Sequence, residues 1–287
     1  MSAIYKSTAG RAAVEARTRE FLTRWPVPNR QFHLPTRAGD TFVVACGPED
    51  GRPVILLHGS GANSVMWMGD AAVWAGQFRL YAVDMIGEPG FSAPARPPLA
   101  SDAYAEWLDD VLTGLSLSST SLARTSLVGI SLGGLLAADY ATRRPERIEK
   151  LALLCPGGIG RQKNFLLKAF PLLFLGSWGR RRMAEMVLGR APQNPTPAER
   201  AMGDYVSLIF RHFRPRLERL PRIGDAALAR LTMPVLAILG GKDVLLDSAD
   251  TRRRLETHVP RPEIVYLPQE GHLLRGQTAA IAAFLAR

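Results

Sequence analysis

The sequence predicts an α/β protein with a mostly parallel sheet whose two faces are covered by helices. Short apolar runs typical of buried strands alternate with amphipathic helical patterns through most of the 287 residues. Several runs are apolar throughout, as strands covered on both faces require. Between residues 157 and 229 this alternation stops, and only helical patterns occur. We therefore expect a core formed by residues 1–156 and 230–287, and an inserted helical segment over residues 157–229.

The individual elements follow from apolar spacing and from the positions of proline and glycine. Strands are expected at residues 32–35, 41–46, 53–57, 79–85, 125–128, 150–155, 235–239 and 263–267. In the core, helices are expected at residues 9–25, 64–75, 104–115, 135–144, 251–257 and 277–286. In the inserted segment they are expected at residues 165–175, 180–188, 197–213 and 226–231. In a parallel sheet, functional residues gather in the loops at the carboxyl ends of the strands.

The composition, 47% hydrophobic and 22% charged residues, is ordinary for a soluble globular enzyme. The net charge of +10 is concentrated between residues 161 and 222, where thirteen Lys or Arg residues face four acidic ones. This segment could attract anionic substrates, but a solvated helical face explains it more simply. No basic motif interleaved with aromatic residues suggests a nucleic-acid partner.

Two further observations concern location. The longest apolar run, residues 165–178, is interrupted by Lys168, Pro171 and Gly176, and residues 1–10 lack the apolar stretch of a secretory signal. Cys46 and Cys155 lie inside apolar runs, which predicts buried thiols and neither a disulfide framework nor a metal site. We expect a cytoplasmic monomer or homodimer with no stable membrane anchor.

The strongest local motif is Gly129-Ile130-Ser131-Leu132-Gly133, which follows an apolar run and precedes a helical pattern. A strand that turns sharply into a helix places the central serine hydroxyl at the edge of the sheet and at a positive helix N-terminus. A glycine-rich turn without chemistry has the same spacing, so the motif alone does not establish catalysis. The serine would need a general base, and the base would need an orienting acid.

Among the five histidines, His272 is the best candidate for the base because it follows the last predicted strand directly. His58 opens a glycine-rich loop and is expected to hold that loop. Asp243 follows the preceding predicted strand and is the candidate orienting acid, with Asp247 as the alternative. The oxyanion would be bound by the backbone N–H of Leu132 and by a second N–H in the loop, from Ser60 or, as the alternative, Gly61.

With these motifs the chain resembles the α/β-hydrolase superfamily over nearly its whole length. The resemblance rests on the following motifs: His58-Gly59-Ser60-Gly61, Asp84-x-x-Gly87-x-x-Gly90-x-Ser92, Gly129-Ile130-Ser131-Leu132-Gly133-Gly134, Gly241-Lys242-Asp243 and Gly271-His272. It implies the order nucleophile, acid, base along the chain and the α/β-hydrolase fold. That fold has an eight-stranded, mostly parallel sheet, no cofactor and a helical cap, or lid, inserted after the sixth strand. Here the cap would be about residues 157–229.

Within the superfamily, the motifs Trp25-Pro26-Val27-Pro28 and Pro35-Thr36-Arg37-x-Gly39 are similar to those of bacterial carboxylesterase-like members. Two departures stand out. Glu88-Pro89 occurs where a Gly-His-Gly sequence is common, which is expected to alter the mouth of the pocket. The loop after His58 reads Gly-Ser-Gly-Ala, not the Gly-Gly-Gly of many lipases or the Gly-Pro-Gly of the C–C bond hydrolases.

These observations predict a serine hydrolase that cleaves a carboxylic ester through an acyl-enzyme, without a metal or cofactor. Ser131 would attack, His272 would carry the proton and Asp243 would orient the imidazole. The same triad could act on another bond, as in a C–C hydrolase, lactonase, thioesterase or perhydrolase, or the fold could serve as a ligand receptor. The expected substrate is a small ester with an apolar acyl or alcohol part.

Candidate substrate-binding residues come from the loop and from the inserted segment. Gly59, Gly61 and Asn63 belong to the loop after His58. Phe165, Phe170 and Trp178 of the inserted segment could line an apolar acyl pocket, although most of them are more simply part of the segment's own core.

Overall fold

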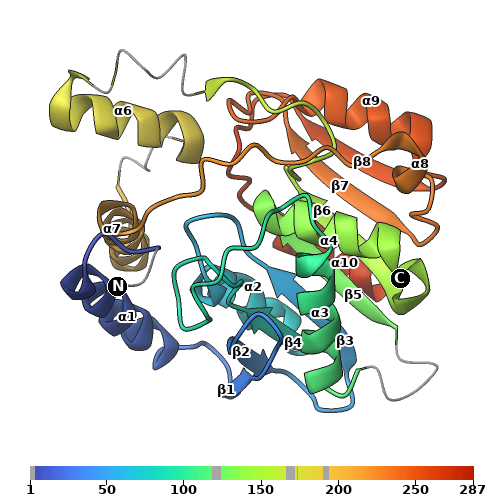
Figure 1. Ribbon diagram of the computed structural model, residues 1–287, viewed down its shortest axis with the longest axis horizontal. Helices are drawn as coiled ribbons and strands as arrows, with labels where there is room; N and C mark the ends of the chain where they lie inside the picture. Colours follow the sequence, from blue (N-terminus) through green and yellow to red (C-terminus); the bar gives the residue numbers. More distant parts are fainter. Residues whose placement is uncertain (1–3, 118–123, 166–171, 173, 190–193) are drawn as a thin grey trace.

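The computed structural model describes residues 4–117, 124–165, 172, 174–189 and 194–287. Its centre is an eight-stranded sheet with the strand order β1-β2-β4-β3-β5-β6-β7-β8 (Figure 1). The β1–β2 and β2–β4 pairs are antiparallel and the other pairs are parallel, which confirms the predicted mostly parallel sheet. The strands are β1 (Asn29–Leu34), β2 (Thr41–Cys46), β3 (Arg52–Leu57), β4 (Phe78–Val83), β5 (Thr125–Ile130), β6 (Ile148–Leu154), β7 (Val235–Gly240) and β8 (Pro262–Leu267).

Helices cover both faces of the sheet. On one face lie α3 (Ala103–Gly114), α4 (Leu132–Arg143), α8 (Asp225–Leu228) and α9 (Ser248–His258). On the other lie α1 (Thr8–Leu22), the 3₁₀ turn η1 (Ser64–Trp67), α2 (Met68–Trp74) and α10 (Thr278–Ala286). Successive residues of β3 alternate between the two cores: Ile55 and Leu57 face one, Val54 and Leu56 the other. This explains the continuous apolar runs of inner strands such as β2, β5 and β7, because both faces of these strands are buried.

The segment between β6 and β7 carries α6 (Gly176–Leu188), α7 (Pro197–His212) and α8. Most of the helix expected at residues 165–175, including Phe170, lies outside the described residues. The N-terminal residues brace α7: Tyr5 forms an isolated β-bridge with Phe213, and the Lys6 ammonium donates to the carbonyls of Phe210 and Arg211. Within the described part of the chain, no helix is both long and apolar enough to cross a membrane.

Several boundaries differ from the expected ones for identifiable reasons. The strand expected at residues 79–85 ends at Val83, because the N–H of Met85 donates to the ring Nε2 of His58 rather than to a neighbouring strand. The helix expected at residues 9–25 ends at Leu22, with Thr23 as its C-cap. The helix expected at residues 135–144 begins three residues earlier, at Leu132, and so includes two glycines that helix propensity alone disfavours.

Gly133 shows why those glycines are present. A Cβ atom at this position would overlap the backbone carbonyl oxygens of Leu57 and His58 at the end of β3. The absent side chain therefore lets the first turn of α4 lie directly against β3. This contact places the start of α4 beside the loop that follows His58.

We predict that Gly133→Ala destabilises the protein by about 1–3 kcal/mol, because two backbone carbonyls must shift to admit the methyl group. Urea unfolding measures the change. Gly203→Ala is the matched control: Gly203 is exposed within α7 with nothing within 4 Å of the added Cβ. Alanine there should stabilise the chain by about 0.5–1 kcal/mol. Equal stability of Gly133→Ala and the native chain would contradict the close-approach explanation.

Candidate active site

Ser131 occupies the turn between β5 and α4 in a strained backbone conformation, with φ 54° and ψ −110°. A positive φ is uncommon for a residue with a side chain. Here it is held by hydrogen bonds on both sides of the residue. The Ser131 N–H donates to the carbonyl of Leu154 at 3.0 Å, and its carbonyl accepts from Gly157 at 2.9 Å and from Leu135 at 3.0 Å. The turn is therefore anchored to the end of β6 and to the segment that follows it.

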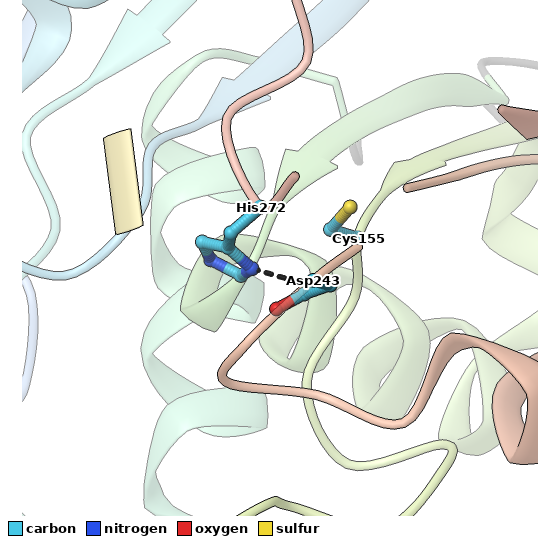
Figure 2. A group of neighbouring side chains, drawn as sticks. All are labelled: Cys155, Asp243 and His272. Atoms are coloured by element: carbon cyan, nitrogen blue, oxygen red, sulfur yellow. Dashed lines mark hydrogen bonds and ion pairs between the residues drawn. The ribbon is translucent and has the colours of Figure 1, made fainter. Parts of the chain in front are cut away.

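His272 lies between Ser131 and Asp243 and is hydrogen-bonded to both. Its Nε2 is 2.9 Å from the Ser131 hydroxyl oxygen, and its Nδ1 is 2.7 Å from Oδ2 of Asp243. Figure 2 shows the imidazole of His272 beside the carboxylate of Asp243. Asp243 is 1% exposed and His272 8%, so water competes little for these bonds. An imidazole with one nitrogen on a hydroxyl and the other on a buried carboxylate is the arrangement of an activated serine.

Close backbone contacts bring the loops that carry Asp243 and His272 together. A Cβ atom at Gly240, the last residue of β7, would overlap the carbonyl oxygen of Gly271, so the glycine lets the loop carrying His272 approach closely. The N–H groups of Gly241 and Lys242 donate to the carbonyls of Leu267 and Glu270, each at 2.8 Å. The loops after β7 and β8 thus pair with each other, which sets the distance between Asp243 and His272.

Asp243 is held as a carboxylate. Its Oδ1 accepts from the N–H groups of Leu245 at 2.7 Å and Leu246 at 3.0 Å. Burial raises the pKa of Asp243, but the hydrogen bonds from His272 and from these two N–H groups outweigh it and leave the pKa below its usual range. The alternative acid, Asp247, instead caps α9 by accepting from the N–H of Asp250. The structure therefore pairs His272 with Asp243.

His58 shapes the loop that follows β3. It is fully buried, and burial lowers its pKa to about 4, so the ring is neutral at ordinary pH. Its Nε2 accepts from the N–H of Met85 at 2.9 Å, because an amide can only donate. The proton is therefore on Nδ1, which donates to the carbonyl of Gly59 at 2.8 Å. His58 therefore contacts its own loop, the role expected from the sequence, and also joins this loop to the one that follows β4, a link that the sequence did not indicate.

Ser60 and Gly61 differ in whether their N–H groups are already engaged. The N–H of Gly61 donates to Oε2 of Glu88 at 2.7 Å. Gly59, one residue before Ser60, lies against Ser131: a Cβ atom on Gly59 would be 3.6 Å from the Ser131 Cβ. Leu132 begins α4, and N–H groups in a first helical turn have no partner within the helix. These contacts favour the Ser60 and Leu132 N–H groups as oxyanion donors.

The other candidate binding residues have different surroundings. Asn63 is buried, donates to the hydroxyl of Tyr205 in α7 at 2.6 Å and accepts from the N–H of Val65, so it links the loop to the inserted segment. Phe165 is half-buried. Trp178 is 61% exposed on α6, which lies at the periphery (Figure 1). A side chain on Gly61 would touch the ring of Phe210, a residue of α7 that the sequence did not suggest.

Among the residues that the structure describes, Cys155, Asp243 and His272 bring potential metal-ligating atoms within 4.8 Å of one another (Figure 2). They do not fit a metal ion. The ring Nδ1 of His272 and Oδ2 of Asp243 are already bonded to each other. Burial and the nearby Asp243 charge raise the pKa of the Cys155 thiol to about 12, so it remains protonated and a poor ligand.

Comparison with known proteins identifies the family of the chain. A model of the alpha/beta hydrolase family matches residues 54–284, which is most of the chain. The chain belongs to the alpha/beta hydrolase family. It is 30% identical to an uncharacterized carboxylesterase, nap, of Bacillus subtilis over 260 residues, which cover 89% of this chain and 84% of that protein. It is 29% identical to carboxylesterase YbfK of the same organism over 272 residues, 92% of this chain and 90% of that one.

Solved structures give the same result for this hydrolase. The crystal structure of naproxen esterase from Bacillus subtilis superposes with a TM-score of 0.81 at 28% identity, covering 98% of this chain and 99% of that one. Carboxylesterase CesB (YbfK) superposes with a TM-score of 0.80 at 26% identity, covering 97% and 98%.

In the sequence Glu88 stands out only as a departure from the family pattern, and nothing there predicts what it contacts. The structure shows its carboxyl group 1% exposed, beneath the loop that carries Ser60 and Gly61. Burial raises the pKa of Glu88 to about 7, although the hydrogen bonds and nearby arginines act in the opposite direction. A glutamate in a sequence otherwise rich in Gly and Pro gave no local signal of this burial.

We predict that Glu88→Gln raises the thermal unfolding temperature at pH 8 but not at pH 5. The native chain holds the Glu88 proton up to about pH 7, whereas an unfolded chain releases it near 4.5. The native state therefore binds more protons in this window, and stability is lost as pH rises from 4.5 through 7. Glutamine does not titrate, so the hydrolase variant avoids this loss.

Unfolding temperatures of both proteins between pH 5 and 8 test this. Glu218→Gln is the control, because the Glu218 side chain is 40% exposed. A Glu88→Gln difference that stays constant with pH would refute the titration of this buried carboxyl group.

Proposed function

We propose that this hydrolase is a carboxylesterase that cleaves its substrate through an acyl-enzyme on Ser131. The observation that carries the proposal is the pair of hydrogen bonds made by His272, one to the Ser131 hydroxyl and one to Asp243. A serine hydroxyl is a weak nucleophile at neutral pH unless a positioned base removes its proton. The two bonds provide that base and fix its tautomer.

The chemistry follows from these contacts. The Ser131 oxygen attacks the ester carbonyl while its proton moves to Nε2 of His272, and the Asp243 carboxylate stabilises the resulting imidazolium. The N–H groups of Ser60 and Leu132 donate to the oxyanion of the tetrahedral intermediate. His272 then gives its proton to the leaving alcohol, and the acyl group stays on Ser131. A water molecule, deprotonated by His272, releases the acid and restores the serine.

The relatives favour an ester over other bonds. Two relatives that align with most of this chain are named carboxylesterases, and one solved structure is named a naproxen esterase. A 2-hydroxy-6-oxo-6-phenylhexa-2,4-dienoate hydrolase and a meta-cleavage product hydrolase are found among the structural neighbours at 20% identity or less, a level that indicates the fold alone. The loop Gly59-Ser60-Gly61 also lacks the proline of the C–C bond hydrolases.

The finer features of the proposal concern the pocket. Residues 157–229 would form a lid over Ser131, and Phe165 and Trp178 of this segment are candidate contacts for an apolar acyl or alcohol part. Gly59 and Gly61 would leave space for the substrate beside the loop. We propose a small ester as the substrate and a monomer or homodimer as the form of the protein. We propose a cytoplasmic location because Cys46 and Cys155 are free and buried.

We predict that Ser131→Ala lowers kcat for short p-nitrophenyl esters by about 10⁶-fold, as removal of a serine nucleophile does elsewhere. A fluorophosphonate probe should label the native chain at Ser131 and leave the variant unlabelled. Labelling of another residue, or full activity of Ser131→Ala, would refute the proposed nucleophile. Substrate-dependent thermal stabilisation without turnover would instead support a ligand receptor.

We predict that Asp243→Asn lowers kcat by about 10⁴-fold, because an amide stabilises the wrong imidazole tautomer. Asp247→Asn is the matched control: asparagine caps a helix as well as aspartate does, so activity and folding should be retained. The same assay with p-nitrophenyl esters measures both. Loss of activity in Asp247→Asn, with Asp243→Asn active, would assign the acid to Asp247.

A further inference from the structure

Glu88 is an unusual residue to find beneath an oxyanion loop. Its Oε2 accepts from the N–H of Gly61 at 2.7 Å and from the Ser60 hydroxyl at 3.1 Å. Burying a carboxyl group is costly unless its partners compensate for the loss of water. One partner belongs to Ser60, whose N–H is the proposed oxyanion contact, and the other to Gly61, the next residue.

The other oxygen of the Glu88 carboxyl group faces the guanidinium of Arg216. Oε1 of Glu88 lies 3.8 Å from Nε of Arg216, and neither atom has a hydrogen-bond partner among the residues that the structure describes. Arg216 is held in place by other groups: its guanidinium donates to the hydroxyl of Tyr104, to Glu218 and to the carbonyl of Pro97. The charge of Arg96 also acts on Glu88, and its guanidinium donates to the carbonyls of Gly87 and Arg214. The strong hydrogen bonds of Glu88 are therefore those to the loop, while its ion pair is long.

Hydrogen bonds with two side chains hold the backbone of the loop after His58 at two successive peptide groups. In a trans peptide the C=O and the following N–H point in opposite directions. His58 holds the carbonyl of Gly59, which directs the N–H of Ser60 away from His58. Glu88 holds the next N–H, that of Gly61. Between them the two side chains leave the peptide that carries the Ser60 N–H little freedom to rotate.

We propose that Glu88 is a positioning residue that orients the Ser60 N–H toward the oxyanion by holding the N–H of Gly61. The inference rests on the proposed function, since it requires an oxyanion on a substrate attacked by Ser131. In this proposal the role depends on the position of the Glu88 side-chain oxygen that accepts from Gly61, and not on the charge of the carboxyl group. Oxyanion donors act only when they are already aligned, and loss of one costs roughly 10²–10³-fold in kcat.

Three substitutions separate the effect of the position of the Glu88 oxygen from the effect of its charge. Glu88→Gln keeps an oxygen acceptor at the same distance and removes the charge. Glu88→Asp keeps the charge but shortens the side chain by one methylene group, so its oxygens lie farther from the N–H of Gly61. Glu88→Ala removes both. Glu218→Gln is the matched control, because Glu218 also contacts Arg216 and no contact joins it to the described residues of the loop after His58.

The measurements are kcat and KM for a p-nitrophenyl ester and the inhibition constant of a trifluoromethyl ketone, which forms an oxyanion when Ser131 adds to it. We expect Glu88→Asp and Glu88→Ala to lose at least 10-fold in kcat and in ketone affinity, with KM within about twofold. Glu88→Gln should stay within about threefold of the native enzyme, and Glu218→Gln should be unchanged. If Glu88→Ala does not fold, the Asp and Gln variants decide the matter.

The opposite order, with Glu88→Asp active and Glu88→Gln impaired, would overturn the inference and assign the role to charge pairing with Arg216. A rise in KM without loss of ketone affinity would also overturn it, because that result indicates a role in the pocket wall. Failure of the proposed function is distinguishable: Ser131→Ala would then retain ester hydrolysis, and both proposals would fall. With Ser131→Ala inactive, the Glu88 variants test the positioning role alone.

Discussion

The positive φ of Ser131 is the constraint on which the arrangement of the site depends. Such a conformation typically costs about 1–3 kcal/mol for a residue with a side chain. It persists because the carbonyl of Leu154 and the N–H groups of Leu135 and Gly157 hold the turn from both sides. The turn sends β5 directly into α4, which places the serine hydroxyl at the carboxyl edge of the sheet and the Leu132 N–H beside it.

The other two members of the site reach this edge by the same route. Asp243 and His272 follow β7 and β8, the two strands at one end of the sheet, and backbone hydrogen bonds join their loops. The carboxylate of Asp243 is buried, yet it accepts three hydrogen bonds, from Leu245, Leu246 and His272. Burial without those donors would raise its pKa and weaken its hold on the imidazole. The sheet sets the positions of these residues, and the hydrogen bonds to Asp243 keep its pKa below the usual range.

The inserted segment is joined to the core through polar contacts at the loop after His58. Tyr205 of α7 accepts from Asn63 and is also hydrogen-bonded to Thr18 of α1. Arg216, which follows α7, faces Glu88 beneath the same loop. At this junction two buried atoms, Glu88 Oε1 and Arg216 Nε, have no hydrogen-bond partner within the described part of the chain, which is uncommon in a folded protein.

Much of this protein is determined by its sequence alone. Apolar runs predicted all eight strands, and the shared edge of a parallel sheet allowed Ser131, Asp243 and His272 to be grouped before their distances were known. The tertiary structure decided the rest. Glu88 accepts a hydrogen bond from the N–H of Gly61, and Asn63 donates one to Tyr205. Helix α4 begins at Leu132, against β3. Glu88 and Gly61 are 27 positions apart in the sequence, and Asn63 and Tyr205 are 142 positions apart. Gly133 and the end of β3 are about 75 positions apart. Periodicity reports only local geometry, so hydrogen bonds and close approaches between distant segments leave no pattern in the sequence.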